Sequence, residues 1–180
     1  MKDSPIPDMY DKAEDESTIL GRLASQIPGF EGYIERGRRR EADQILRETI
    51  SGRLEDSRLQ LSNVHQELGR DIAKAMDYAE PLGRADTRLM GLIGKIKDAP
   101  QGYAGFFDAV KIKEDELAQL YAFDESMLAY CDQIGADIDA LEKATLDSGD
   151  IDSGIRMLDS TLREANSAFG SRQEILSGVS

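Results

Sequence analysis

The residues best equipped for chemistry in this sequence are one histidine, His65, and one cysteine, Cys131. A di-iron site in a helical bundle takes a Glu-x-x-His pair from each of two helices and a glutamate from each of two more. Here the only histidine has Ser62, not glutamate, three residues before it. One cysteine and one histidine also cannot complete a structural zinc site. We therefore expect no metal and no other cofactor, with His65 at a core boundary or on the surface.

Three aspartates crowd one short segment, namely Asp147, Asp150 and Asp152. A calcium loop needs the pattern Asp-x-Asp-x-Asp-Gly and a bidentate glutamate at its twelfth position, and neither is present. Turn and capping chemistry explains the segment better. We expect Gly149 to be the first residue beyond one helix and Asp150 to cap the next.

Patterns for an enzyme are missing from the sequence. It contains no phosphate-binding loop, no dinucleotide-binding glycine pattern and no serine elbow. Cys131 falls at apolar helical spacing with Leu128 and Ile134, so we interpret it as a small core residue rather than a nucleophile. These observations favour a protein that is not an enzyme.

One carboxylate, Asp124, falls on an apolar face beside Phe123. A buried carboxylate needs a partner. An arginine from the preceding long helix, Arg47 or Arg53, could supply it. We expect such a pair to set the register between helices rather than to catalyse a reaction.

Four arginines stand within five residues: Arg36, Arg38, Arg39 and Arg40. One interpretation is a docking patch for an acidic partner, such as the acidic half of another copy, or for anionic lipid head groups. The other is pairing with acidic residues nearby on the same helix or in the second half of the chain. The helix dipole disfavours positive charge at a helix start, which favours the docking interpretation.

Glycines and aromatic residues cluster between Gly102 and Phe107. Tyr103, Phe106 and Phe107 form either an aromatic hinge or a pocket for a partner. The alternative is a tight turn in which Phe106 and Phe107 plug the end of a helical bundle. Phe106 and Phe107 belong to both interpretations, and Tyr103 to the first.

The composition is that of one acidic domain. The chain has 180 residues and a formal net charge of −13, which argues against a nucleic-acid partner because such a partner needs a basic face. The charge is uneven, since residues 99–180 hold 16 acids and 6 bases, a net of −10. We expect no signal peptide and no transmembrane segment, and a single cysteine fits a cytoplasmic location.

Apolar residues recur at helical spacing along almost the whole chain. Residues 17–27 predict a short helix that ends at Pro28-Gly29. From Glu35 to Ala79 the steps are threes and fours, apart from Ser57 in one slot, which predicts a rod of about 65–70 Å. Pro81 then forms either a tight hairpin or a kink in a continuing helix. The apolar stripe stays in phase across it, which favours the kink.

The clearest break falls at residues 98–105. Two further helices are expected, one ending near Asp147 and one from Ile151 that frays at residues 177–180. No alternating pattern predicts a strand. We therefore expect an all-α fold, an elongated antiparallel bundle or coiled coil of three to four helices with a short N-terminal helix. It would be one domain over residues 17–180, preceded by a disordered acidic segment over residues 1–16.

Two stretches carry a resemblance to known proteins. One is Pro28-Gly29-Phe30-Glu31-Gly32-Tyr33, followed by Arg39-Arg40-Glu41-Ala42-Asp43; the other runs Gly102-Tyr103-Ala104-Gly105-Phe106-Phe107-Asp108-Ala109-Val110-Lys111. Together they resemble a family of small, uncharacterised bacterial coiled-coil proteins over roughly residues 28–145. The resemblance implies a helical fold and no particular activity.

The sequence thus predicts a structural, scaffold or adaptor protein that self-associates or docks a protein partner through a helical face. The alternative is a peripheral protein that docks on an anionic membrane surface through residues 17–40. Liposome binding would separate the two.

Overall fold

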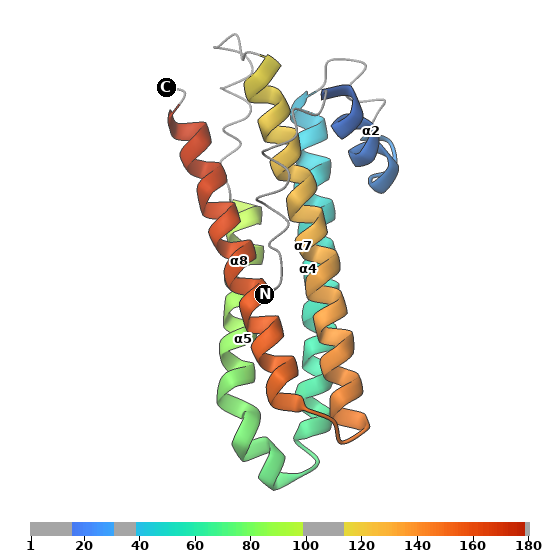
Figure 1. The fold of residues 1–180 in the computed structure, drawn as a ribbon, viewed down its shortest axis with the longest axis vertical. Helices are drawn as coiled ribbons and strands as arrows, with labels where there is room; N and C mark the ends of the chain where they lie inside the picture. The colour runs from blue at the N-terminus through green and yellow to red at the C-terminus, as the bar shows by residue number, and fades with distance from the viewer. Residues whose placement is uncertain (1–15, 31–38, 99–113, 179–180) are drawn as a thin grey trace.

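The chain folds as an all-α helical bundle. The computed structural model describes residues 16–30, 39–98 and 114–178, and within those ranges it holds five helices and no strand (Figure 1). Four of the helices are long and lie along one another, and the fifth is short and lies beside one end. The all-helical prediction is confirmed for this part of the chain.

The short helix is α2, Glu16–Gln26. Its apolar residues Ile19 and Leu23 are buried, together with Ile27 and Phe30 beyond its end. Gly29 has a φ of 83°, a left-handed conformation that ends the helix at little steric cost because glycine has no Cβ. A short N-terminal helix ending at Pro28-Gly29 is therefore confirmed.

Helix α4, Arg39–Leu68, covers most of the predicted rod but not all of it. Its buried residues follow the predicted spacing, and Ser57 fills its slot in the core by donating a hydrogen bond to the Arg53 carbonyl at 3.0 Å. The expectation of one helix to Ala79 is wrong, however, because the chain turns at residues 69–71.

The turn is built from local hydrogen bonds. The amides of Gly69 and Asp71 donate to the carbonyls of His65 and Leu68 at 3.0 and 3.2 Å. Asp71 then caps the next helix, because its Oδ1 accepts hydrogen bonds from the amides of Ala73 and Lys74 at 3.0 and 3.3 Å. This cap satisfies two amides that the first helical turn would otherwise leave unpaired.

Helix α5, Ile72–Asp98, contains Pro81 in its interior. The hairpin at Pro81 is therefore excluded, and the continuing helix is confirmed. The chain reversal does exist, but it lies at residues 69–71, ten residues before the proline. Helix α5 returns along α4 (Figure 1).

The last two helices are α7, Glu114–Leu146, and α8, Ile151–Gly178. Between them Ser148, not Gly149, takes the left-handed conformation, with a φ of 55°. Gly149 serves a different purpose, since a Cβ there would lie 3.2 Å from Ala144 Cα. Asp150 caps α8 as expected, because its Oδ1 accepts the Ser153 amide hydrogen bond at 2.9 Å.

The four long helices close a ring in which α4 contacts α5 and α7, and α8 contacts the same two. Their buried leucines and isoleucines form one continuous core, and α2 packs on α7. Ion pairs join neighbouring helices at the edge of this core. Arg22 of α2 forms a bidentate pair with Glu125 of α7, and Arg88 of α5 pairs with Asp159 of α8.

Candidate interaction groove

Helix α5 carries a second apolar stripe that faces away from the core. Ile72 and Met76 are each 79% exposed, and Met90 is 50% exposed. On a helix with 3.6 residues per turn these positions share one face with Ala79, Gly83 and Gly94. Below we call Ile72, Met76, Ala79, Gly83, Met90 and Gly94 the outer stripe of α5.

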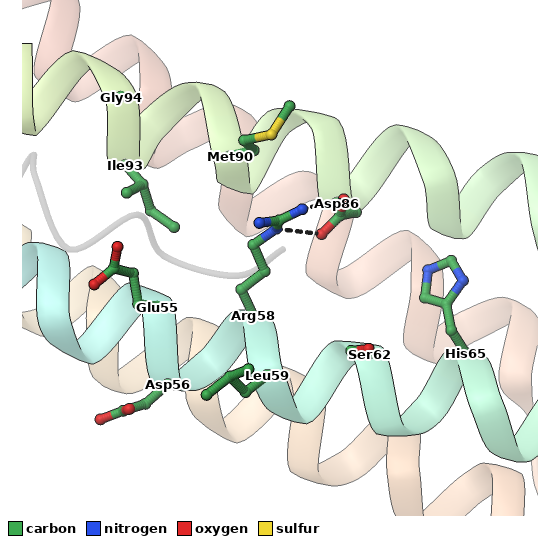
Figure 2. A pocket seen from close by; sticks show the side chains of 10 residues that line it. All are labelled: Glu55, Asp56, Arg58, Leu59, Ser62, His65, Asp86, Met90, Ile93 and Gly94. Carbon is green, nitrogen blue, oxygen red and sulfur yellow. Dashed lines mark hydrogen bonds and ion pairs between the residues drawn. The ribbon is translucent and has the colours of Figure 1, made fainter.

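A groove of about 940 Å³ lies between α4 and α5 beside the outer stripe (Figure 2). Its most exposed apolar wall residue is Leu59 of α4, at 68%. Met90 and Gly94 come from the outer stripe, and Ile93 points from α5 toward α4. The lining residues are Glu55, Asp56, Arg58, Leu59, Ser62, His65, Asp86, Met90, Ile93 and Gly94.

Ion pairs join the two helices along the groove. Arg58 forms a two-pronged pair with Asp86, from Nε to Oδ1 at 2.7 Å and from Nη2 to Oδ2 at 3.2 Å (Figure 2). The hydrogen bond to Asp86 raises the pKa of Arg58. Lys97 of α5 pairs with Glu55 of α4. The charged residues therefore hold α4 and α5 together. The apolar residues Leu59 and Met90 of the groove wall stay exposed.

His65 lies in the groove wall, partly buried, as expected for a boundary residue. Its Nε2 is buried and has no hydrogen-bond partner in the part of the chain that the structure describes. Among those same residues, no group of three or more His, Cys, Asp or Glu side chains is placed to hold a metal ion. His65 shares the groove wall with Arg58 and Ser62.

Cys131 is a core residue, as the sequence predicted. It is buried, and its Sγ lies 3.9 Å from the Ile50 carbonyl oxygen of α4. Burial raises the pKa of the Cys131 thiol to about 12. The thiol is therefore protonated at neutral pH and lacks the thiolate that nucleophilic catalysis requires.

Asp124 is buried, as expected. Arg53, one of its two proposed partners, instead pairs with Asp132 at 3.3 Å and donates to the Gln26 carbonyl at the same distance. The sequence interpretation missed a second buried carboxylate, Asp137 of α7. It accepts hydrogen bonds from Thr161 Oγ1 at 2.5 Å and Gln133 Nε2 at 2.8 Å, which links α7 to α8.

The position of Asp137 was visible in the sequence. It stands three residues after Ile134 and four before Leu141, on the same apolar face. Three residues of the outer stripe, Ile72, Met76 and Ala79, were assigned to the core stripe of the predicted rod.

The predicted partner-binding residues lie elsewhere. Arg39 and Arg40 are the first residues of α4, and the structure describes their backbone only. The other five, Arg36, Arg38, Tyr103, Phe106 and Phe107, lie outside the described residues. Their roles stay predictions.

Comparison with known proteins gives no relative from which a function could be transferred. No protein-family model matches the chain, and no curated protein or solved structure matches it. In the described ranges, no helix is both long enough and apolar enough to cross a membrane. The groove and the outer stripe therefore have to be interpreted from their own chemistry.

Proposed function

We propose that this protein is a non-enzymatic scaffold or adaptor that acts by packing a helical face against another protein chain or a second copy of itself. The observation that carries the proposal is the outer stripe of α5, where Ile72, Met76 and Met90 are half or more exposed. Large exposed apolar residues in a row on one helix are typical of interaction surfaces. Leu59 widens this apolar surface across the groove.

The architecture that we propose for this role is an elongated antiparallel bundle with coiled-coil packing. The long helices have 27 to 33 residues, which corresponds to lengths of about 40–50 Å at 1.5 Å per residue. Lys97 of α5 pairs with Glu55 of α4, and Arg58, farther along α4, pairs with Asp86, farther back on α5. A long bundle offers one uninterrupted helical face to a partner, which a compact domain of the same size does not.

The surface of the bundle supports binding rather than catalysis. Among the described residues, His65 Nε2 has no hydrogen-bond partner, and no three metal-ligating side chains gather in the groove. The single cysteine is buried with a raised pKa, and its presence as a free thiol fits the cytoplasmic location that we propose.

Docking on an anionic membrane surface through residues 17–40 is the alternative. An amphipathic helix binds a membrane through exposed apolar residues. On α2, Ile19 and Leu23 are buried in the bundle instead, as is Ile27 just beyond its end. The membrane alternative would therefore depend on Arg36, Arg38, Arg39 and Arg40.

Photocrosslinking in the native cell tests the proposal. A photoreactive phenylalanine analogue placed at Met90 should give a protein–protein adduct, because the outer stripe would lie against another chain. The same analogue at Leu146, which is 62% exposed but off the outer stripe, is the matched control. An equal absence of adducts at both positions, with binding to anionic liposomes intact, would overturn the scaffold proposal in favour of the membrane alternative.

A further inference from the structure

We infer that the outer stripe of α5 is the seam of a two-fold symmetric dimer, in which α5 packs antiparallel on α5 of a second copy. This inference rests on the proposed function and names the partner. Three features of α5 support it: the spacing of its large and small residues, the position of Gly83, and the distribution of charge along the helix.

The outer stripe is complementary to itself in the antiparallel direction. With a two-fold axis at Gly83, residue 72 faces residue 94 of the other copy and residue 76 faces residue 90. Ile72 then lies against Gly94, where there is no side chain in the way. Met76 lies against Met90, and methionine adapts its shape to a partner surface. A parallel pairing would instead set Ile72 against Ile72 and leave Gly94 against Gly94, a poorer match of volumes.

Gly83 stands at the centre of this arrangement. A Cβ built on Gly83 or on Gly94 would meet nothing within 4 Å, so the packing of the monomer does not require glycine at either position. Glycine inside a helix destabilises it relative to alanine. Glycine at these two positions of the stripe would let the backbone of a second helix approach closely.

Charge along α5 favours the same orientation. Residues 71–83 contain Asp71, Asp77 and Glu80 against Lys74, a net of −2. Residues 84–98 contain Arg84, Arg88, Lys95 and Lys97 against Asp86 and Asp98, a net of +2. Several of these charges are already paired within one copy, Arg88 with Asp159, Lys97 with Glu55 and Asp86 with Arg58, so the complementarity is one of formal charge along the helix. An antiparallel pair places the acidic end of each helix beside the basic end of the other, whereas a parallel pair places like charges together.

Leu59 completes the seam from α4. It lies across the groove from Met90 (Figure 2) and is 68% exposed, so a second α5 that extended over the groove would also cover it. The partner of each copy is thus an identical helix, in which Ile72 meets Gly94 and the two methionines meet each other. Self-complementarity of this kind is what a two-fold interface requires.

Sedimentation equilibrium tests the dimer directly. The wild-type protein should sediment as a dimer, and the double variant Met76→Glu/Met90→Glu should raise the dissociation constant by about 100-fold or more, since it buries four carboxylates at the seam. Leu146→Glu is the matched control, because it changes an equally exposed apolar residue off the seam, and it should leave the dissociation constant unchanged. Circular dichroism should give all three proteins the same helix content.

Thiol crosslinking tests the direction of packing. In a Cys131→Ala background, Ile72→Cys and Gly94→Cys are prepared separately and mixed, and a short bismaleimide is added. The antiparallel seam predicts the mixed 72–94 adduct and little of the 72–72 or 94–94 adducts. Ala140→Cys, on an exposed position of α7, should crosslink to neither position.

These experiments can reject the dimer without rejecting the proposed scaffold function. A monomeric wild-type protein, or a Leu146→Glu variant that dissociates as much as the double variant, overturns the dimer. If the protein is monomeric and the photoreactive group at Met90 captures a different protein, the scaffold role stands and the two-copy seam falls. Predominant 72–72 and 94–94 adducts overturn the antiparallel arrangement.

Discussion

Helix α5 presents two apolar faces that the bundle treats in opposite ways. The inner face places Leu82, Leu89 and Leu92 in the core with almost no exposure, whereas the outer stripe leaves Met76 and Met90 in solvent. Both faces have helical spacing, and leucine and isoleucine on the inner face contrast with methionine and glycine on the outer stripe. Periodicity therefore identifies a helix but does not show which of its faces is buried in the fold.

Two adjacent residues test the difference between the two faces most directly. Leu89 is fully buried and Met90 is half exposed, one position along the same helix. We expect Leu89→Ala to lower the free energy of unfolding by about 2–5 kcal/mol, because it leaves a cavity in the core. Met90→Ala should change the stability of the monomer by no more than about 0.5 kcal/mol.

Urea unfolding followed by circular dichroism at low protein concentration measures both values. At low concentration, association does not add to the unfolding free energy of the protein that carries Met90. Comparable losses for the two variants would show that the outer stripe is covered within the chain, and the contrast between the faces would disappear.

Much of the fold could be predicted from the sequence because burial repeats with helical spacing. That spacing identified α2, the core face of α4, and the continuation of α5 through Pro81. It could not locate the chain reversal at residues 69–71, because Leu61, Val64, Leu68 and Ile72 follow one another in steps of three and four. The reversal depends on Gly69 and on the cap that Asp71 gives to α5, and these are local signals that an unbroken stripe conceals.

The outer stripe was hidden by a related effect. A step of three residues falls about 60° behind a full turn of the helix. From Met76 the apolar residues follow in three such steps, through Ala79 and Leu82 to Ala85, so the line passes from the outer stripe to the inner face. The groove could not be predicted at all, because it requires knowing that α4 and α5 are neighbours.

The pH dependence of stability tests the burial of a core residue, Cys131. Burial holds the pKa of Cys131 near 12 in the folded protein, against 9.0 for an ordinary thiol. Above pH 9 the unfolded chain releases this proton and the folded chain retains it. The contribution of Cys131 is therefore intact below pH 9 and is lost between about pH 9 and 12, at about 1.4 kcal/mol of unfolding free energy per pH unit.

Urea titrations at several pH values between 8 and 11 measure this slope, with Cys131→Ala as the control. Lysines and tyrosines titrate in both proteins, so the difference between the two slopes belongs to the thiol. Identical slopes would mean that Cys131 reaches solvent in the folded protein, which would contradict its place in the core.

The smallest effect comes from two glycines in different surroundings. Gly83 lies on the outer stripe with open space where a Cβ would be, whereas a Cβ at Gly154 of α8 would lie 3.0 Å from Leu141 Cδ1 and 3.4 Å from its Cα. We expect Gly83→Ala to raise the unfolding free energy of the monomer by about 0.5–1 kcal/mol, the usual gain of alanine over glycine in a helix. Gly154→Ala should lower it, because α7 and α8 already touch there.

Thermal melts at low and high protein concentration then separate folding from association. A methyl group at Gly83 would lie on the proposed two-fold axis and push the two α5 backbones apart. The variant should therefore melt above the wild type when dilute and lose that advantage when concentrated, since ligand-like binding of a second copy stabilises only the chain that can pair. If the advantage persists at every concentration, Gly83 is not at a seam, and the exposed face of α5 would need a partner that approaches it elsewhere.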